Sequence, residues 1–123
     1  MINTSLIFAI ICCLNHLYPT TQRPDYLKFS EYDLQVDASY AYASPVELYF
    51  FQNRLEYPFD MLSTANYRGH IAYWRLEDGL LLLDSLDVDG TIKYSDDYDI
   101  GTKKNETGRS VIADWFNGMI SAK

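Results

Sequence analysis

The clearest pattern of hydrophobic and polar positions runs from residue 69 to residue 86, around the dipeptide Asp78-Gly79. Aromatic and β-branched residues precede this pair, and an apolar run over residues 80–86 follows it. Because Asp and Gly tolerate the positive φ angles of a two-residue turn, the pattern predicts a β-hairpin over residues 69–86. Both faces of the hairpin carry apolar side chains, so we expect it to lie at the centre of a sheet.

A two-residue turn also predicts the register of the hairpin. Counting outward from the turn sets Trp74 opposite Leu83 on one face. On the other face it places Arg75 diagonal to Asp84, within reach of a long side chain. We therefore expect an ion pair across the strands on that face.

A helix start is indicated at Ser44. Ser44 can cap the helix, Pro45 suits the first helical position, and Glu47 completes a capping box. These residues predict a short packing helix near residues 45–54, and a looser alternation over residues 26–36 predicts one or two short strands. The expected fold class is α+β, mostly β, with a small antiparallel sheet centred on the hairpin and one packing helix.

Three segments are expected along the chain. Residues 1–17 contain an apolar run too short to span a bilayer, which resembles the core of a signal peptide but has no Lys or Arg before it. Residues 18–24 have the composition of a linker, and residues 25–123 of a single globular domain. An exported or envelope-associated protein and a cytoplasmic one are equally compatible with this pattern, and membrane contact is expected only through such a signal or a lipid anchor.

Composition narrows the classes of partner. The aromatic share is 15%, with eleven Tyr, which favours strands. Seventeen acidic residues against ten basic ones give a net charge of −7, which would repel a nucleic-acid backbone and suits a cationic protein. Both cysteines lie in the first thirteen residues, so the rest of the chain has no internal disulfide.

Two stretches, residues 66–76 and 113–118, resemble a family of small uncharacterised bacterial proteins. Those proteins have an Asn-Trp-Arg-Gly-Tyr-x-Ala-Thr-Trp-Glu-Ile hairpin and a later Trp-Phe-Ser-Gly element. The resemblance covers residues 32–118 and implies an architecture but no activity. This chain departs from the family at four positions, namely Tyr67, His70, Tyr73 and Arg75. Relatives continue beyond the equivalent of Gly118, so the resemblance implies a truncated member with an open sheet edge that invites pairing.

Candidate chemistry is sparse. The expected register sets His70 opposite Asp87, and a carboxylate can orient an imidazole for general base catalysis, although no nucleophile motif accompanies the pair. Four further residues are candidates for an aromatic and guanidinium-lined ligand pocket, with core packing as the simpler alternative. These residues are Asn66, Arg68, Trp74 and Trp115.

Metal and cofactor binding are not expected. Asp87-Val88-Asp89-Gly90 is similar to the opening of a calcium loop, but Thr91 and Tyr98 stand where the third ligand and the bidentate Glu are needed. No phosphate-binding or dinucleotide-binding motif is present in the sequence. The sequence predicts a non-enzymatic binding or interaction protein, exported or neutralising a basic partner. The alternative is a small hydrolase or sugar-binding enzyme that uses His70 and Asp87.

Overall fold

The structure is a computed structural model, and it describes residues 22–36, 44–104, 109–117, 120 and 122–123. The signal-like segment 1–17 and the first part of the expected linker lie outside these residues. The elements in chain order are β1 (Asp25–Phe29), β2 (Tyr32–Val36), α2 (Pro45–Gln52), β3 (Ile71–Glu77), β4 (Leu80–Val88), β5 (Thr91–Lys93), the 3-10 helix η1 (Ser95–Asp97) and β6 (Val111–Ile112).

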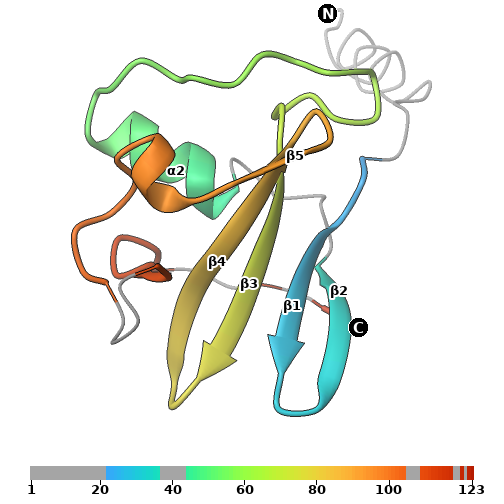
Figure 1. Cartoon of the computed structure of the whole chain (residues 1–123), viewed down its shortest axis with the longest axis vertical. Coiled ribbons are helices and arrows are strands. Elements are labelled where there is room, and N and C mark those ends of the chain that lie inside the picture. Colours follow the sequence, from blue (N-terminus) through green and yellow to red (C-terminus); the bar gives the residue numbers. More distant parts are fainter. Residues whose placement is uncertain (1–21, 37–43, 105–108, 118–119, 121) are drawn as a thin grey trace, which may run out of the picture.

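The strands form one mixed sheet in the order β2-β1-β3-β4-β5, and β6 pairs with the outer side of β4 (Figure 1). All neighbours are antiparallel except β1 and β3, which run parallel. The predicted class, α+β and mostly β, is confirmed. The sheet is mixed rather than purely antiparallel because the first hairpin, β1–β2, lies beside β3 with its strand β1 parallel to β3.

The β3–β4 hairpin lies at the centre of the sheet, as predicted. Its turn uses left-handed backbone at both residues, with φ of 52° at Asp78 and 77° at Gly79. Trp74 pairs with Leu83, which confirms the predicted register next to the turn. This pair, one residue from each strand, belongs to the buried apolar core.

The predicted register is wrong in the other half of the hairpin. The pairing shifts by one residue midway along the strands, where β4 contains a bulge at Asp84. As a result Ile71, and not His70, lies opposite Asp87. Counting from the turn assumes an uninterrupted ladder, and a single extra residue on one strand is enough to break that assumption.

The bulge holds the expected ion pair. Both carboxylate oxygens of Asp84 accept hydrogen bonds from the Arg75 guanidinium, at 3.1 Å each. The Ser110 hydroxyl also donates to Asp84. Asp84 thus links the central hairpin to the segment that leads into β6. The hydrogen bond to Asp84 raises the pKa of Arg75 above its ordinary value, while burial acts in the opposite direction.

The single described helix, α2, begins as predicted. The backbone of Ser44 donates to the Glu47 side chain at 2.9 Å, and the backbone of Glu47 donates to the Ser44 hydroxyl at 3.3 Å. The helix ends at Gln52, two residues before the expected end, because Arg54 already has a left-handed φ of 56°.

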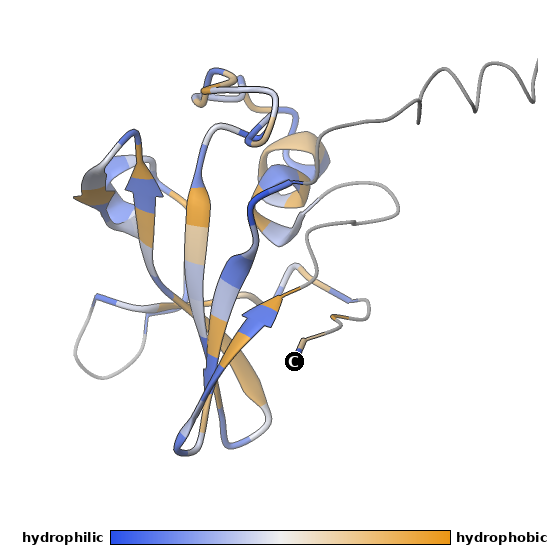
Figure 2. Cartoon of the chain, turned by 90° about the vertical axis from the view of Figure 1, so that its right-hand side faces the viewer, coloured by the Kyte–Doolittle hydropathy of each residue, from blue (hydrophilic) through white to orange (hydrophobic). Residues whose placement is uncertain are grey.

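Val46 and Phe50 of α2 join the apolar core of the sheet. Hydrophobic and hydrophilic residues alternate along the strands in Figure 2, as half-buried strands require. The buried apolar residues of the core are Leu27, Val36, Val46, Phe50, Phe59, Ala72, Trp74, Leu83, Leu86, Ile100, Val111 and Ala113.

Gly69, at the entrance to β3, allows a close approach between two chain segments. It has a φ of +81°, and a Cβ there would lie 2.3 Å from the carbonyl oxygen of Asp60. Gly79 has a similar φ of +77°, but no atom would lie within 4 Å of its Cβ. A side chain at Gly79 would therefore introduce backbone strain alone, whereas a side chain at Gly69 would add a steric clash to the same strain.

We expect Gly79→Ala to lower the free energy of unfolding by about 1 kcal/mol, the cost of a side chain in left-handed backbone. Gly69→Ala should cost about 3 kcal/mol, because overpacking is added to the same strain. Urea denaturation of both variants measures the difference. Equal losses would show that Gly69 does not depend on its contact with Asp60.

Candidate functional site

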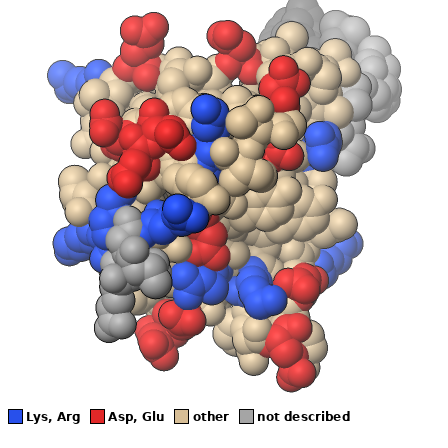
Figure 3. All heavy atoms as spheres, viewed as in Figure 1, with Lys and Arg blue, Asp and Glu red and all other residues tan. Residues whose placement is uncertain are grey.

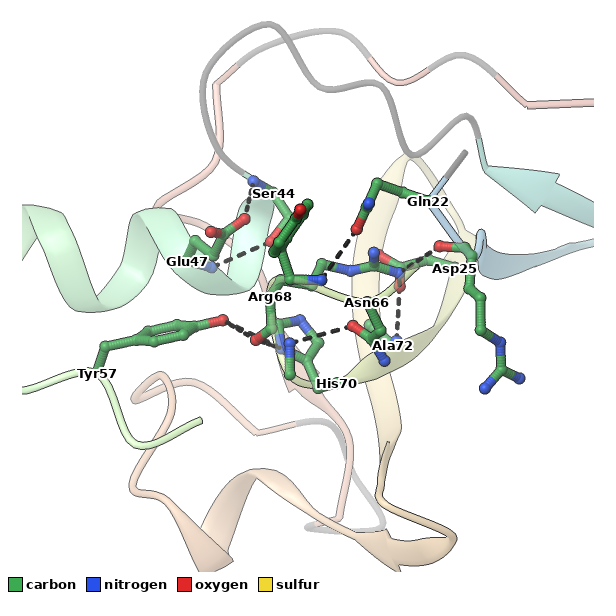
Figure 4. Close-up of polar contacts among 12 residues, drawn as sticks. Gln22, Asp25, Ser44, Glu47, Tyr57, Asn66, Arg68, His70 and Ala72 are labelled. Atoms are coloured by element: carbon green, nitrogen blue, oxygen red, sulfur yellow. Dashed lines mark hydrogen bonds and ion pairs between the residues drawn. The ribbon is translucent and has the colours of Figure 1, made fainter. Parts of the chain in front are cut away.

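A buried ion pair lies where the chain enters β1 and β3 (Figure 4). The Arg68 guanidinium donates to the Asp25 carboxylate at 2.7 Å, with side chains 5% and 0% exposed. The same carboxylate oxygen accepts the backbone N–H of Ala72 at 2.8 Å, and Arg68 also donates to the carbonyl oxygen of Arg23 at 2.8 Å. Arg68, a candidate ligand-binding residue in the sequence, thus uses its guanidinium to join the start of β1 to the segment before β3.

Gln22 and Arg23, which the sequence places in a linker, are bound to the turn before β3. The backbone N–H of Arg23 donates to Ala65 at 2.8 Å, and the Gln22 amide donates to the carbonyl oxygen of Thr64 at 2.8 Å. The backbone N–H of Tyr67 donates to Gln22 at 3.0 Å. Both residues of this segment are thus hydrogen-bonded to the turn that leads into β3.

His70 is fully buried beside this ion pair. Its Nδ1 lies 3.2 Å from the carbonyl oxygen of Arg68 and 3.3 Å from the hydroxyl of Tyr57, and its ring packs 4.7 Å from that of Phe59. Burial lowers the pKa of His70 to about 4, while the nearby Asp25 acts in the opposite direction. Burial also raises the pKa of Tyr57, whose hydroxyl donates to the carbonyl oxygen of Arg68. His70 is therefore neutral at pH 7 and enclosed by protein.

The predicted pairing of His70 with Asp87 is not formed, because Ile71 occupies the position opposite Asp87. Asp87 instead accepts the backbone N–H of Gly90 at 2.8 Å and closes the turn between β4 and β5. The structure therefore separates the two members of the candidate catalytic pair: one lies in the interior and the other at a surface turn.

The four predicted ligand-binding residues serve different parts of the fold. Asn66 is buried, and its side-chain oxygen accepts the backbone N–H of Gly69 at 3.1 Å. Trp74 belongs to the core, whereas the Trp115 indole donates to the carbonyl oxygen of Pro45 at 2.7 Å and so holds α2. Both tryptophans therefore agree with the alternative that they pack in or against the core.

Two of the predicted residues, Asn66 and Asp87, line one open pocket of about 300 Å³. The pocket lies where the segment before β1, the turn before β3 and the β4–β5 turn meet. Asp89 places a second carboxylate there, and Arg23 contributes the one guanidinium in its lining; the remaining lining residues are Leu62, Ser63, Ile71 and Gly90. Sequence reasoning missed Arg23 and Leu62, because nothing in the sequence signals that these distant segments come together.

Figure 3 shows carboxylates at both ends of the sheet, and one group lies at the end opposite the Asp78-Gly79 turn. We call this region the acidic end; it consists of residues 51–67 and 87–99. Its acidic residues are Glu56, Asp60, Asp87, Asp89, Asp96, Asp97 and Asp99. Of these, Asp96 is paired with Lys104. These carboxylates outnumber the basic residues of the same segments, Arg54 and Lys93, so the local field is negative.

The acidic end also exposes large apolar side chains. Single exposed apolar residues are ordinary on a folded protein, and Phe29, Tyr32 and Leu80 are exposed elsewhere on this one. Those exposed here are Phe51, Leu55, Met61, Leu62, Tyr67 and Ile92.

No family model, curated protein or solved structure matches this chain. The described residues contain no cluster of three or more His, Cys, Asp or Glu arranged to hold a metal ion. Among the same residues, no helix is long and apolar enough to cross a membrane.

Removing one member of the buried ion pair should be costly. We expect Asp25→Asn to lower the free energy of unfolding by about 3–5 kcal/mol, because the Arg68 charge is left without its partner in the interior. Asp33→Asn breaks the exposed pair with Lys28, at 3.6 Å, and should cost less than about 1 kcal/mol. Urea denaturation tests both, and similar losses would contradict the role given to Asp25.

The neutral state of His70 should make stability depend on pH. The unfolded chain binds a proton at His70 near pH 6.5, whereas the folded chain does so only near pH 4. The contribution is therefore complete above pH 6.5 and is lost as the pH falls towards 4, by about 3 kcal/mol in all. Denaturation curves between pH 7 and pH 4 should show this slope, and His70→Asn should flatten it. An unchanged slope in the variant would contradict the assignment.

Proposed function

We propose that this chain is a non-enzymatic binding protein whose partner is a basic protein, bound at the acidic end. The observation that carries the proposal is the coincidence, at one end of the sheet, of exposed apolar side chains and clustered carboxylates. Apolar groups supply affinity when they are buried against a partner, and carboxylates attract a basic partner and orient it.

The chemistry of the interior supports the same proposal. The Tyr57 hydroxyl and the His70 imidazole both lie against the carbonyl oxygen of Arg68, and the Arg68 guanidinium binds Asp25. A general base must reach the proton that it removes, and a buried imidazole with a lowered pKa is poorly placed for that work. These groups stabilise the fold that presents the acidic end.

Asp87 and Asp89 define the most specific part of the surface. They line the pocket next to exposed Leu62, so a Lys or Arg side chain of the partner can enter between carboxylates while its stem lies against an apolar group. A basic protein held there has part of its own charged surface covered. More specifically, we propose that binding at the acidic end neutralises that partner.

We also propose that the chain belongs to the bacterial family that its hairpin resembles. Two features of the fold support it. The Gly of the Arg-Gly pair has a positive φ and touches the preceding segment, and Trp115 of the later element holds α2. Both residue types therefore have a structural reason to recur at these positions.

Binding should depend on charge at the acidic end. We expect the double variant Asp87→Asn, Asp89→Asn to bind small basic proteins, such as lysozyme and cytochrome c, about tenfold more weakly at low salt. Glu77→Gln with Asp78→Asn, at the opposite end of the hairpin, is the matched control and should bind as the unchanged chain does. Surface plasmon resonance between 20 and 300 mM salt provides the measurement.

Two results would overturn the proposal. Affinity that is the same at every salt concentration would show that charge does not drive the association. Equal weakening by the double variant and by the control pair would show that net charge matters but the acidic end does not.

A further inference from the structure

The chain contains two Asp-Gly dipeptides, and the structure places them in matching turns. Asp78-Gly79 joins β3 to β4 and Asp89-Gly90 joins β4 to β5, so the two turns lie at opposite ends of β4 (Figure 1). Each turn is two residues long and is closed by an antiparallel pair of strand residues. The φ angle is 52° at both aspartates and 77° and 85° at the two glycines, and all four residues are exposed. Sequence, backbone conformation and access to solvent are therefore alike in the two turns.

The two turns differ in the partner of the glycine N–H. The N–H of Gly90 donates to Oδ1 of Asp87, three residues earlier, at 2.8 Å. The residue at the same place before Gly79 is Leu76, whose side chain has no acceptor. Among the residues that the structure describes, the N–H of Gly79 makes no hydrogen bond. A carboxylate therefore holds one glycine nitrogen, whereas the other is open to solvent.

The backbone nitrogen that follows an aspartate can attack that aspartate's own side chain. The Gly79 nitrogen, once a solvent base has removed its proton, forms a bond to Cγ of Asp78, and the carboxyl group loses one oxygen as water. Water then opens the resulting five-membered succinimide ring at either of its two carbonyl carbons. Opening at Cγ restores aspartate, whereas opening at the backbone carbonyl gives isoaspartate, in which the main chain runs through the side-chain methylene. The net reaction is an isomerisation without oxidant or cofactor, and glycine, having no side chain, hinders it least.

We propose that Asp78 is a site of spontaneous isomerisation to isoaspartate, and that the Asp87 side chain protects Asp89 from the same reaction. The attacking species is the deprotonated glycine nitrogen. A hydrogen bond from that N–H to a carboxylate keeps the proton on the nitrogen, because the nearby negative charge opposes its loss. The same hydrogen bond fixes the direction of the N–H of Gly90. The nitrogen of Gly79 is under neither restraint.

Protection of Asp89 preserves the shape of the pocket at the acidic end. Asp89 lines that pocket together with Asp87. Isomerisation at Asp89 would add a methylene to the main chain and displace its carboxylate, whereas isomerisation at Asp78 alters a turn at the far end of β4. The modification does not depend on what the acidic end binds, because the reaction needs only the turn and water.

The test incubates the folded full chain in ¹⁸O-labelled water at neutral pH. Each passage through the succinimide places one solvent oxygen in the affected residue, whichever carbonyl carbon the water attacks. Trypsin digestion in ordinary water then releases the peptide over residues 76–93, and its fragment masses assign the label to one dipeptide or the other. We expect Asp78 to gain label at least about tenfold faster than Asp89, the ratio that corresponds to one hydrogen bond to a charged group. Equal rates, or no label at Asp78, would overturn the proposal.

The same incubation in urea separates the effect of the hydrogen bond from that of the flanking sequence. The unfolded chain lacks the contact between Asp87 and Gly90, so both dipeptides should gain label at similar rates. A preference for Asp78 that is as large in urea as in the folded chain would contradict the protective role of Asp87, because the neighbouring residues would then account for it.

Two variants of Asp87 test the protection directly. Asp87→Ala removes the acceptor, and we expect the rate of labelling at Asp89 to rise about tenfold, to the rate at Asp78. Asp87→Asn is the matched control, because its amide oxygen can still accept the N–H of Gly90, and labelling at Asp89 should stay well below that of the alanine variant. Equal rates in the two variants, or an unchanged rate in Asp87→Ala, would contradict the role of the hydrogen bond. If Asp87→Ala does not fold, the comparison of the folded chain with the chain in urea still decides.

Discussion

The Asp25–Arg68 ion pair is the contact on which the arrangement of this domain depends. β1 and β3 are far apart in the sequence and run parallel, so no tight turn sets their register. One oxygen of Asp25 receives both the Arg68 guanidinium and the backbone N–H of Ala72. A charge buried this completely requires its partner in place, and that requirement fixes β1 against β3 more narrowly than apolar packing does.

Local signals in the sequence were sufficient for local structure. Asp78-Gly79 specifies its turn and Ser44 its helix start, because each acts on neighbours within four residues. The bulge at Asp84 has no such signal: it satisfies Arg75 and Ser110, and Ser110 is distant in the sequence. The His70–Asp87 hypothesis failed at that bulge.

The same limit applies to the candidate site. Asn66 was a candidate because it precedes the hairpin, and Asp87 because of a register that proved wrong, yet the pocket contains both. Arg68 and Trp74 were candidates for a ligand pocket with core packing as the alternative, and both are buried. A sequence shows that a residue type is unusual for its neighbourhood, but whether a guanidinium faces solvent or Asp25 depends on a strand more than forty positions away.

The parallel contact between β1 and β3 also has a kinetic consequence. The β1–β2 and β3–β4 hairpins each close over a two-residue turn, so each can form within its own stretch of chain. The seam between them joins residues such as Tyr26 and Tyr73, and the whole intervening loop must be ordered first. The two hairpins therefore form quickly, whereas the pairing of β1 with β3 forms slowly. That junction is the natural boundary for partial opening, in which the β1–β2 pair separates as a unit while the central hairpin stays intact.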